Sequence, residues 1–214
     1  MLGLAPAPQP ASKKKSTAKS PGKSRSKPKA TSDIYQLKIT LKNIKPPIWR
    51  RVLVPSDFTL DQLHRLIQAT MDRWYDYHLH EFIIDGIRYG DAAGALEAGD
   101  SVVEETRTHL QNVLRGEKHK FEYTYDFGDS WDHEIVLEKI LAREGDQTYP
   151  RCIKGKRSGP PEDCGGPWGY ADFLATIGDP ENPEHEELLE WAGGEFDPEY
   201  FDLEEINQEM KARV

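Results

Sequence analysis

The sequence predicts an α+β domain in which hairpins build an antiparallel or mixed sheet, a helix packs on the sheet, and further helices close the chain. Three observations predict this class. Apolar residues alternate with polar ones early and again in the middle of the chain, a capped amphipathic helix separates these runs, and helical spacing dominates after residue 170. A hairpin followed by a helix is reminiscent of a β-grasp opening, which is an analogy of arrangement.

The N-terminal residues differ from the rest in composition. Residues 1–31 consist mainly of Ala, Ser, Pro and Lys, and they contain eight Lys and Arg residues and no acid. Because so few large apolar side chains cannot offset the entropy of ordering, we expect a disordered basic tail over residues 1–32 and a single domain over 33–210. The tail is either a solubilising linker or an arm that contacts polyanions such as nucleic acid.

Charge and hydropathy restrict the function classes. The whole chain has a net charge of −9, so residues 32–214 carry −17, which disfavours non-specific binding to DNA or anionic lipid. No apolar run reaches the roughly 18 residues of a membrane span, and no secretory leader is recognisable. Two cysteines provide no disulfide framework, and we expect a cytoplasmic protein without membrane contact.

The first elements follow from local patterns. Residues 35–42 alternate as a half-buried strand, the two prolines in 43–47 indicate a turn, and 48–54 form the returning strand. Thr59 and Gln62 have the spacing of a capping box, which predicts the start of a helix.

The middle of the chain predicts two more hairpins. Asp85-Gly86 lies between two apolar runs and indicates a tight primed turn. Residues 91–118 form a loop with a helical stretch near 110–114. The strand over 121–127 turns at 128–130 and pairs with 131–140.

The last third combines an ordered loop with three helices. Many Pro and Gly residues predict a loop over 145–169. A helix follows over about 170–177. The next has Asn182 as its N-cap and ends before Gly193, and the last begins at Asp202.

Three polar segments, at 78–82, 125–133 and 150–170, contain residues that the fold alone does not require. We expect them to converge on a pocket with polar contacts and aromatic walls. The candidate ligand-binding residues are His78, His80, Asp126, Asp129, Trp131, His133, Trp168 and Tyr170.

Four motifs carry a family resemblance. They are Pro-Pro-Ile-Trp-Arg-Arg at 46–51, His-x-His-x-Phe at 78–82, Asp-Phe-Gly-Asp-x-Trp-x-His at 126–133, and the Pro-x-Cys … Pro-Pro-Glu-Asp-Cys-Gly-Gly-x-x-Gly-Tyr segment at 150–170. Together they resemble the plasmid pRiA4b ORF-3-like family over about residues 33–208. The resemblance implies a bacterial or archaeal origin and carriage on plasmids and transposons.

Some members of that family are labelled transposon resolvase-like, but the resemblance implies no established activity. A serine recombinase needs a nucleophilic serine, an arginine cluster and a DNA-reading element. The acidic body shows no clear helix-turn-helix, which argues against recombination.

Metal binding is one chemical hypothesis. His80, His133, Cys152 and Cys164 are acceptable ligand types for zinc, the cofactor that these residues suggest. The twelve-residue separation of the cysteines is not that of a zinc ribbon. Alternatively, the histidines cap strands and the cysteines pack as small apolar groups.

A cysteine nucleophile is a second hypothesis. Cys164 precedes Gly165-Gly166, whose amides would approach an oxyanion, with His133 as base and Asp129 orienting it. Alternatively, the glycines only supply a turn.

Two charged regions suggest partners. A basic cluster would recognise phosphate or an acidic ligand, unless it is a solvated loop. Its members are Arg50, Arg51, Arg151, Lys154, Lys156 and Arg157. Residues 179–209 contain thirteen acids and no Lys or Arg, which suits either solvated helices or docking of a basic partner.

The sequence therefore predicts a non-catalytic accessory or binding protein of a mobile element. The alternatives are a metal- or cysteine-dependent hydrolase that uses the same pocket, and a DNA-binding accessory factor that acts through the tail.

Overall fold

The computed structural model describes residues 1–3, 32–71, 74–93 and 101–214. The chain divides into two units, Met1–Ala30 and Thr31–Val214, and the second is the domain described below. Most of the predicted tail lies outside the described residues, so its disorder and its nucleic-acid contact stay predictions. Among the described residues, no helix is long and apolar enough to cross a bilayer.

The domain contains eight strands and several helices. In chain order the elements are β1 (Ile34–Leu41), β2 (Trp49–Pro55), α1 (Leu60–Thr70), β3 (His80–Ile84), β4 (Ile87–Gly90), β5 (Val103–Glu104), the 3-10 turn η1 (Glu105–Arg107), α3 (Leu110–Val113), β6 (Lys120–Tyr125), β7 (Trp131–Leu141), β8 (Arg151–Lys156), α4 (Gly166–Ile177), α5 (His185–Trp191) and α6 (Leu203–Arg213).

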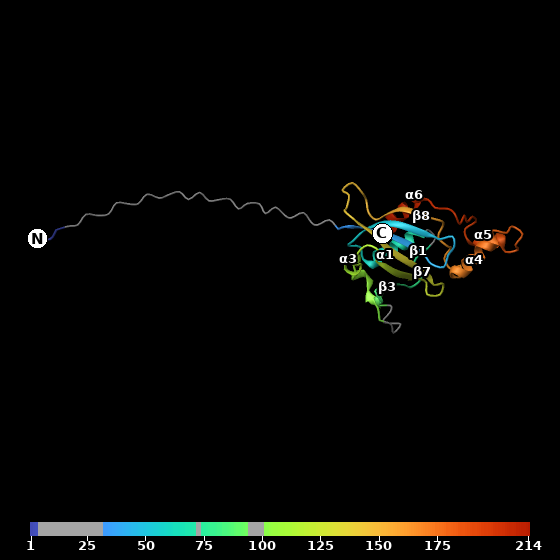
Figure 1. Ribbon diagram of the computed structural model, residues 1–214, viewed down its shortest axis with the longest axis horizontal. Helices are drawn as coiled ribbons and strands as arrows, with labels where there is room; N and C mark the ends of the chain where they lie inside the picture. Colours follow the sequence, from blue (N-terminus) through green and yellow to red (C-terminus); the bar gives the residue numbers. More distant parts are fainter. Residues whose placement is uncertain (4–31, 72–73, 94–100) are drawn as a thin grey trace. The chain divides into compact units, whose positions relative to one another are not determined.

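The eight strands found in the described residues form one sheet in the order β5-β4-β3-β6-β7-β1-β2-β8. Figure 1 labels β1, β3, β7 and β8. Neighbouring strands are antiparallel except β4 and β5, which are parallel. This arrangement confirms the predicted α+β class with a mixed sheet. The β-grasp analogy is not confirmed.

The alternating pattern of β1 places one set of side chains in the core. Leu37, Ile39 and Leu41 are almost fully buried against the helical layer. Burying a side chain of this size contributes about 1.5–3 kcal/mol, so the register of this central strand is strongly determined. The predicted strands at 35–42 and 48–54 are confirmed.

Helix α1 covers the same face of the sheet. The capping box is present, since Gln62 N donates to Thr59 Oγ1 at 3.2 Å and Thr59 N donates to Gln62 Oε1 at 2.9 Å. Leu63, Leu66 and Ile67 are fully buried. Helix α1 therefore begins at the predicted position and presents its apolar stripe to the sheet.

The predicted hairpin between β3 and β4 is also confirmed. Asp85 and Gly86 have φ values of 51° and 78°, as a type I′ turn requires. The β6–β7 hairpin turns through Asp126, whose φ is 54° and whose Oδ1 accepts from Gly128 N at 2.9 Å.

The interval 145–169 is not only a loop, because it contains β8. This strand pairs with β2 at the edge of the sheet. Its outer edge is covered at one point by Asn207 of α6, whose amide donates to Cys152 O at 3.0 Å and accepts from Cys152 N at 2.8 Å. A side chain thus replaces a neighbouring strand, which protects an otherwise open edge.

The C-terminal helices differ in part from prediction. Helix α4 begins at Gly166, earlier than expected. Helix α5 has Glu184 as its N-cap, so the prediction of Asn182 in that role is wrong; the Asn182 side chain instead accepts from Glu184 N in the preceding turn. Asp202 caps α6 as predicted.

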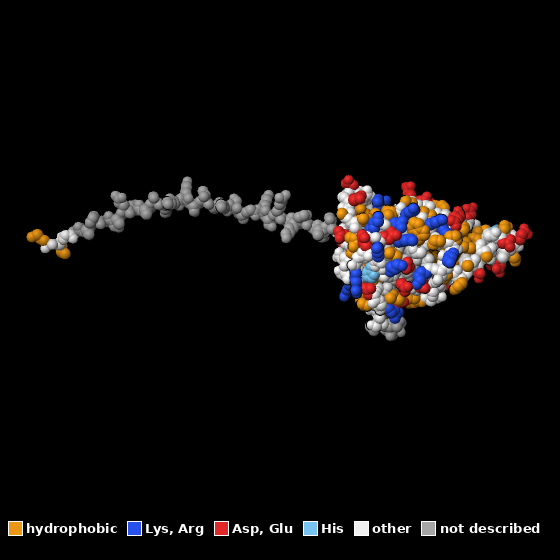
Figure 2. All heavy atoms as spheres, in the orientation of Figure 1, with side chains coloured by type: hydrophobic (Ala, Val, Ile, Leu, Met, Phe, Trp, Pro, Cys, Tyr) orange, Lys and Arg blue, Asp and Glu red, His pale blue; other side chains and the backbone are white. Residues whose placement is uncertain are grey.

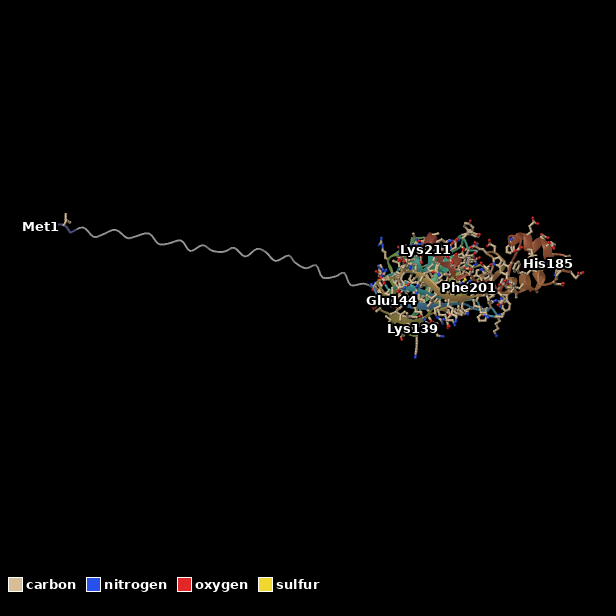
Figure 3. All side chains as sticks on the ribbon, turned by 90° about the horizontal axis from the view of Figure 1, so that it is seen from above. Met1, Lys139, Glu144, His185, Phe201 and Lys211 are labelled. Atoms are coloured by element: carbon tan, nitrogen blue, oxygen red, sulfur yellow. The ribbon has the colours of Figure 1, made fainter. Side chains whose placement is uncertain are left out.

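The acidic residues around α5 gather at one end of the domain. Figure 2 shows many red side chains around α5, which Figure 1 places at the right. His185 of α5 lies there, and Glu144 in the β7–β8 connection lies at the opposite end (Figure 3). The predicted basic partner of this acidic surface stays a prediction.

Candidate functional site

A cavity of about 360 Å³ lies where α1, the segment before β3, the end of β4 and η1 meet. Its base is polar, with His64, Asp76, His80 and Glu105, and Phe127 contributes apolar surface. The cavity therefore brings together side chains from five separate parts of the chain.

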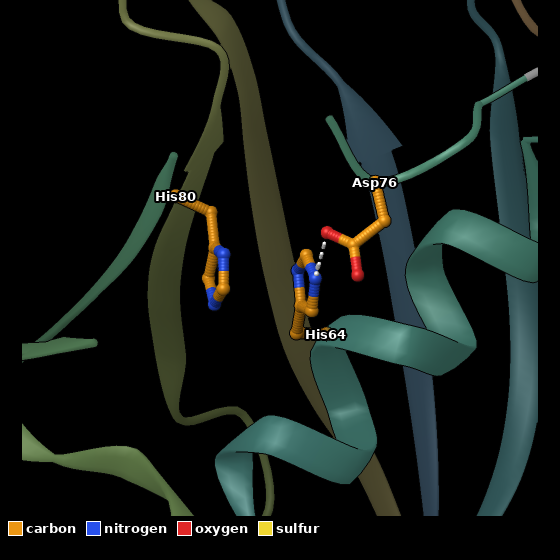
Figure 4. A group of neighbouring side chains, drawn as sticks. All are labelled: His64, Asp76 and His80. Atoms are coloured by element: carbon orange, nitrogen blue, oxygen red, sulfur yellow. Dashed lines mark hydrogen bonds and ion pairs between the residues drawn. The ribbon is translucent and has the colours of Figure 1, made fainter. Parts of the chain in front are cut away.

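Two histidines stack at the base of this cavity. The rings of His64, from α1, and His80, the first residue of β3, have centroids 3.5 Å apart and planes inclined by 6° (Figure 4). His64 occupies the buried face of α1, and the alternation of β3 directs His80 to the face that α1 covers.

Each histidine contacts a carboxylate. His64 Nε2 lies 2.8 Å from Asp76 Oδ1, and His80 Nε2 lies 2.9 Å from Glu105 Oε2. Asp76 has a φ of 63°, so its position depends on a left-handed backbone. Glu105 is only 4% exposed, and a buried carboxylate needs such a partner.

A hydrogen-bonded chain orients His64. Gln68 Nε2 donates to the Tyr123 hydroxyl at 3.0 Å, and this hydroxyl lies 2.8 Å from His64 Nδ1. All contacts are satisfied when the hydroxyl donates to Nδ1 and His64 Nε2–H donates to Asp76. The ring is then neutral, in agreement with burial, which lowers the pKa of His64 despite the opposing effect of Asp76. Burial is the largest single effect on the pKa of Asp76 and would raise it, but the hydrogen bond from His64 together with the charges of His64, His80 and Arg65 lowers this pKa overall.

A second cluster lies beside the first and consists of His78, Asp126 and Asp163. His78 Nε2 lies 2.9 Å from Asp163 Oδ1, and His78 Nδ1 lies 3.7 Å from Asp126 Oδ2. The first cluster consists of His64, Asp76 and His80. In each cluster, one possible ligand atom from every residue lies within 4.8 Å of those from the other two.

The expected aromatic walls are not part of the cavity. Trp131 and Tyr170 are buried in the core, whereas Trp168 is 82% exposed on α4. Of the predicted ligand-binding residues, His78 and His80 do line the cavity. The three polar segments thus converge only in part, because Trp131 and Tyr170 pack in the core and Trp168 lies exposed on the surface.

His133 is a core residue. Its ring meets Trp74 edge-on at 5.6 Å and lies 5.3 Å from the ring of Tyr123. Neither ring nitrogen has a hydrogen-bond partner among the described residues. Burial lowers the pKa of His133 to about 4, so the ring is neutral at physiological pH. This environment does not suit the predicted role of general base.

Cys164 lies near Asp129, as predicted, but its surroundings oppose the predicted chemistry. Gly165 N donates to Asp129 Oδ2 at 3.1 Å, which joins the two loops. Burial first, and the Asp129 carboxylate second, raise the pKa of Cys164 to about 12. A nucleophilic cysteine needs the opposite shift. Cys164 and His133 form no hydrogen bond with each other, since neither ring nitrogen of His133 has a partner among the described residues.

The predicted zinc ligands do not share one place. Cys152 lies on β8 and His80 on β3, five strand positions apart in the sheet. At about 4.8 Å per strand this corresponds to about 24 Å. The set of His80, His133, Cys152 and Cys164 therefore cannot bind one ion. Of these four, only His80 belongs to a cluster of ligating residues within the part of the chain that the structure describes.

The predicted basic patch consists largely of structural residues. Buried Arg50 donates to Thr70 O at 2.8 Å and to Lys156 O at 3.0 Å, which ties the end of α1 to β8. Arg51 forms a bidentate pair with Glu138.

The remaining members of the basic patch include both structural and exposed residues. Arg157 is buried and donates to Pro198 O. Arg151 donates to Gln147. Only Lys154 and Lys156 are exposed, so a phosphate site made of all six residues does not form.

Sequence reasoning missed three of the residues that form the cavity, namely His64, Asp76 and Glu105. A signal for His64 was present, because it lies between Leu63 and Leu66 on the apolar stripe of an amphipathic helix. A polar residue at such a position requires a partner. Asp76 and Glu105 carry no comparable signal, since each lies in irregular or very short structure.

Comparison with known proteins agrees with the fold. Residues 33–205 match the family described as plasmid pRiA4b ORF-3-like protein. The chain is 35% identical over 179 residues to "Uncharacterized protein y4hQ" of Sinorhizobium fredii, covering 83% of this chain and 90% of that protein. The crystal structure of a protein of unknown function, MM3350 from Methanosarcina mazei Go1, is similar with a TM-score of 0.74 and 42% identity, covering 82% of this chain and 97% of that chain. The chain belongs to the plasmid pRiA4b ORF-3-like family.

Proposed function

We propose that this domain is a binding protein whose ligand is a divalent transition-metal ion of the zinc class. The ion would lie at the base of the cavity, held by His64, Asp76 and His80, with Glu105 adjacent. The observation that carries the proposal is the grouping of these ligating atoms within 4.8 Å at the base of an open cavity. The family name supports, as part of the same proposal, an accessory role on plasmids.

The charge of the cavity favours a cation. Five carboxylates line it against two arginines, Arg65 and Arg88. These arginines pair with Asp61 and Glu81, at 3.0 and 2.6 Å. Within the described part of the chain, Asp76 and Glu105 at the base form their ion pairs with the two imidazoles.

The donor types favour a transition metal over calcium or magnesium. Two imidazoles with one or two carboxylates suit zinc and similar ions, whereas calcium and magnesium prefer oxygen alone. A metal-bound imidazole needs a hydrogen-bond partner for its other ring nitrogen. For Nδ1 of His64, the Tyr123 hydroxyl would be that partner.

Metal binding would require the imidazoles at the base of the cavity to change their orientation. Each Nε2 now faces a carboxylate, and the parallel rings cannot both direct a lone pair at one ion. Binding therefore requires one imidazole, that of the less buried His80, to turn about its Cβ–Cγ bond. Because neutral imidazole and ionised carboxylate are the forms that bind a metal, affinity should rise with pH.

The test is isothermal titration of the full-length, chelator-treated protein with zinc chloride. We expect His80→Asn and Asp76→Asn to weaken binding at this site at least about tenfold. His109→Asn is the control, because His109 lies outside both clusters and contacts Asp57 O. Wild-type affinity in both cavity variants, with unchanged circular dichroism, would refute the proposal.

A metal-dependent hydrolase using the same cavity is the second candidate. The volume of about 360 Å³ favours it, because an ion with one water, at about 30 Å³ per water, leaves room for a substrate. Zinc-dependent cleavage of an activated phosphate or carboxylic ester, abolished in Asp76→Asn, is the expected result. Equal turnover with and without zinc would eliminate it.

A further inference from the structure

We infer that His78, Asp126 and Asp163 form a second divalent-cation site, separate from the one proposed above. The three residues come from the segment before β3, the β6–β7 turn and the loop before α4. One ligating atom from each lies within 4.8 Å of the others. The inference goes beyond the proposed function, because it concerns different residues and stands whether or not the first site binds metal.

The geometry leaves the required oxygen atoms available. Asp126 uses Oδ1 to accept from Gly128 N at 2.9 Å, whereas its Oδ2 faces His78 at 3.7 Å. On the other side, Asp163 Oδ1 lies 2.9 Å from His78 Nε2. One imidazole and two carboxylates would bind an ion and leave further positions for water, because the Asp163 side chain is 65% exposed.

The backbone holds both acids in an unusual conformation. Asp126 and Asp163 have φ values of 54° and 60°, in the left-handed region. Aspartate tolerates this region better than most residues, but the conformation still costs free energy. The two acids come from separate loops, adopt the same conformation and lie next to each other in space. The fold therefore positions both carboxylates against His78.

The local charge favours a divalent ion. Glu162 lies beside the cluster and accepts hydrogen bonds from the Tyr125 hydroxyl and from Tyr75 N, so its oxygens are occupied. Among the described residues, no Lys or Arg forms an ion pair with Asp126, Glu162 or Asp163. One imidazolium cannot balance these three carboxylates, whereas a divalent cation would leave about one negative charge.

The experiment is titration of full-length, chelator-treated protein with zinc chloride, combined with NMR of the histidine imidazoles. We expect wild-type protein to bind two ions and the His78 ring nitrogens to shift on one of the two events. Asp163→Asn should weaken that event at least about tenfold and leave the other unchanged. Because this side chain is largely exposed and the amide is isosteric, the fold should persist.

The control is Asp132→Asn. Asp132 follows the same hairpin turn, but its carboxylate accepts from Thr124 on the opposite face of the sheet. Its zinc titration should match that of the wild type.

The outcomes separate the two sites. A single ion that Asp163→Asn removes and His80→Asn does not would support this inference and refute the proposed function. A single ion that His80→Asn removes and Asp163→Asn does not would overturn this inference. His78 would then serve only in an ion pair with Asp163. No zinc uptake would overturn both.

Discussion

Replacing His133 with leucine should make the stability of the domain less dependent on pH. The ring is fully buried, and burial lowers its pKa from 6.5 to about 4. Between these values the unfolded chain binds a proton that the folded protein does not, so stability falls as the pH decreases. Between pH 8 and pH 5, the titration of His133 should lower the free energy of unfolding by about 2 kcal/mol.

The replacement removes this contribution while nearly preserving volume. Since neither nitrogen of His133 has a partner among the described residues, an apolar side chain leaves no hydrogen-bonding group unsatisfied. We expect stability at pH 8 to change by less than about 1.5 kcal/mol.

Urea unfolding followed by circular dichroism at pH 8 and pH 5 measures the effect. Wild type should lose about 2 kcal/mol more than His133→Leu between the two values. Other titrating groups cancel in this comparison, because both proteins contain them. His109→Leu, which removes a histidine outside the core, should behave as wild type. An equal loss in His133→Leu and wild type would show that the buried ring does not control this pH dependence.

Two further predictions concern the loop between β8 and α4. Native Cys164 should resist alkylation by iodoacetamide at pH 8, because a pKa of about 12 leaves roughly one thiolate in ten thousand. Mass spectrometry measures the rate of labelling, with urea-unfolded protein as the reference. Equal labelling rates in native and unfolded protein would contradict the prediction. Gly159→Ala should lower the free energy of unfolding by at least about 2 kcal/mol, since its Cβ would lie 2.0 Å from Met71 O. Gly145→Ala, where a Cβ meets nothing within 4 Å, should stay within about 0.5 kcal/mol of wild type in the same urea experiment, and an equal loss in both would disprove the steric argument.

The sequence by itself determined the elements whose causes are local. The alternation of 35–42, the Thr59–Gln62 capping box and the Asp85-Gly86 turn each specify a conformation through neighbouring residues, and the structure has all three. Strand β8 was missed because its cause is not local. It forms because β2 offers unpaired backbone groups on one side and α6 supplies Asn207 on the other. The local sequence of this stretch is typical of a Pro- and Gly-rich loop.

Only the tertiary structure decided which polar residues form a site. His80 and His133 look equivalent in the sequence, each at or near the start of a strand and close to aromatic residues. One faces a cavity with a carboxylate partner, and the other lies between Trp74 and Tyr123 without one. The difference comes from what covers each position. His64 shows the same dependence, since its partners Asp76 and Tyr123 become its neighbours only when α1, the segment before β3 and β6 pack together. The free energy of a polar side chain depends on the partners and burial that distant parts of the chain supply, and local sequence does not contain this information.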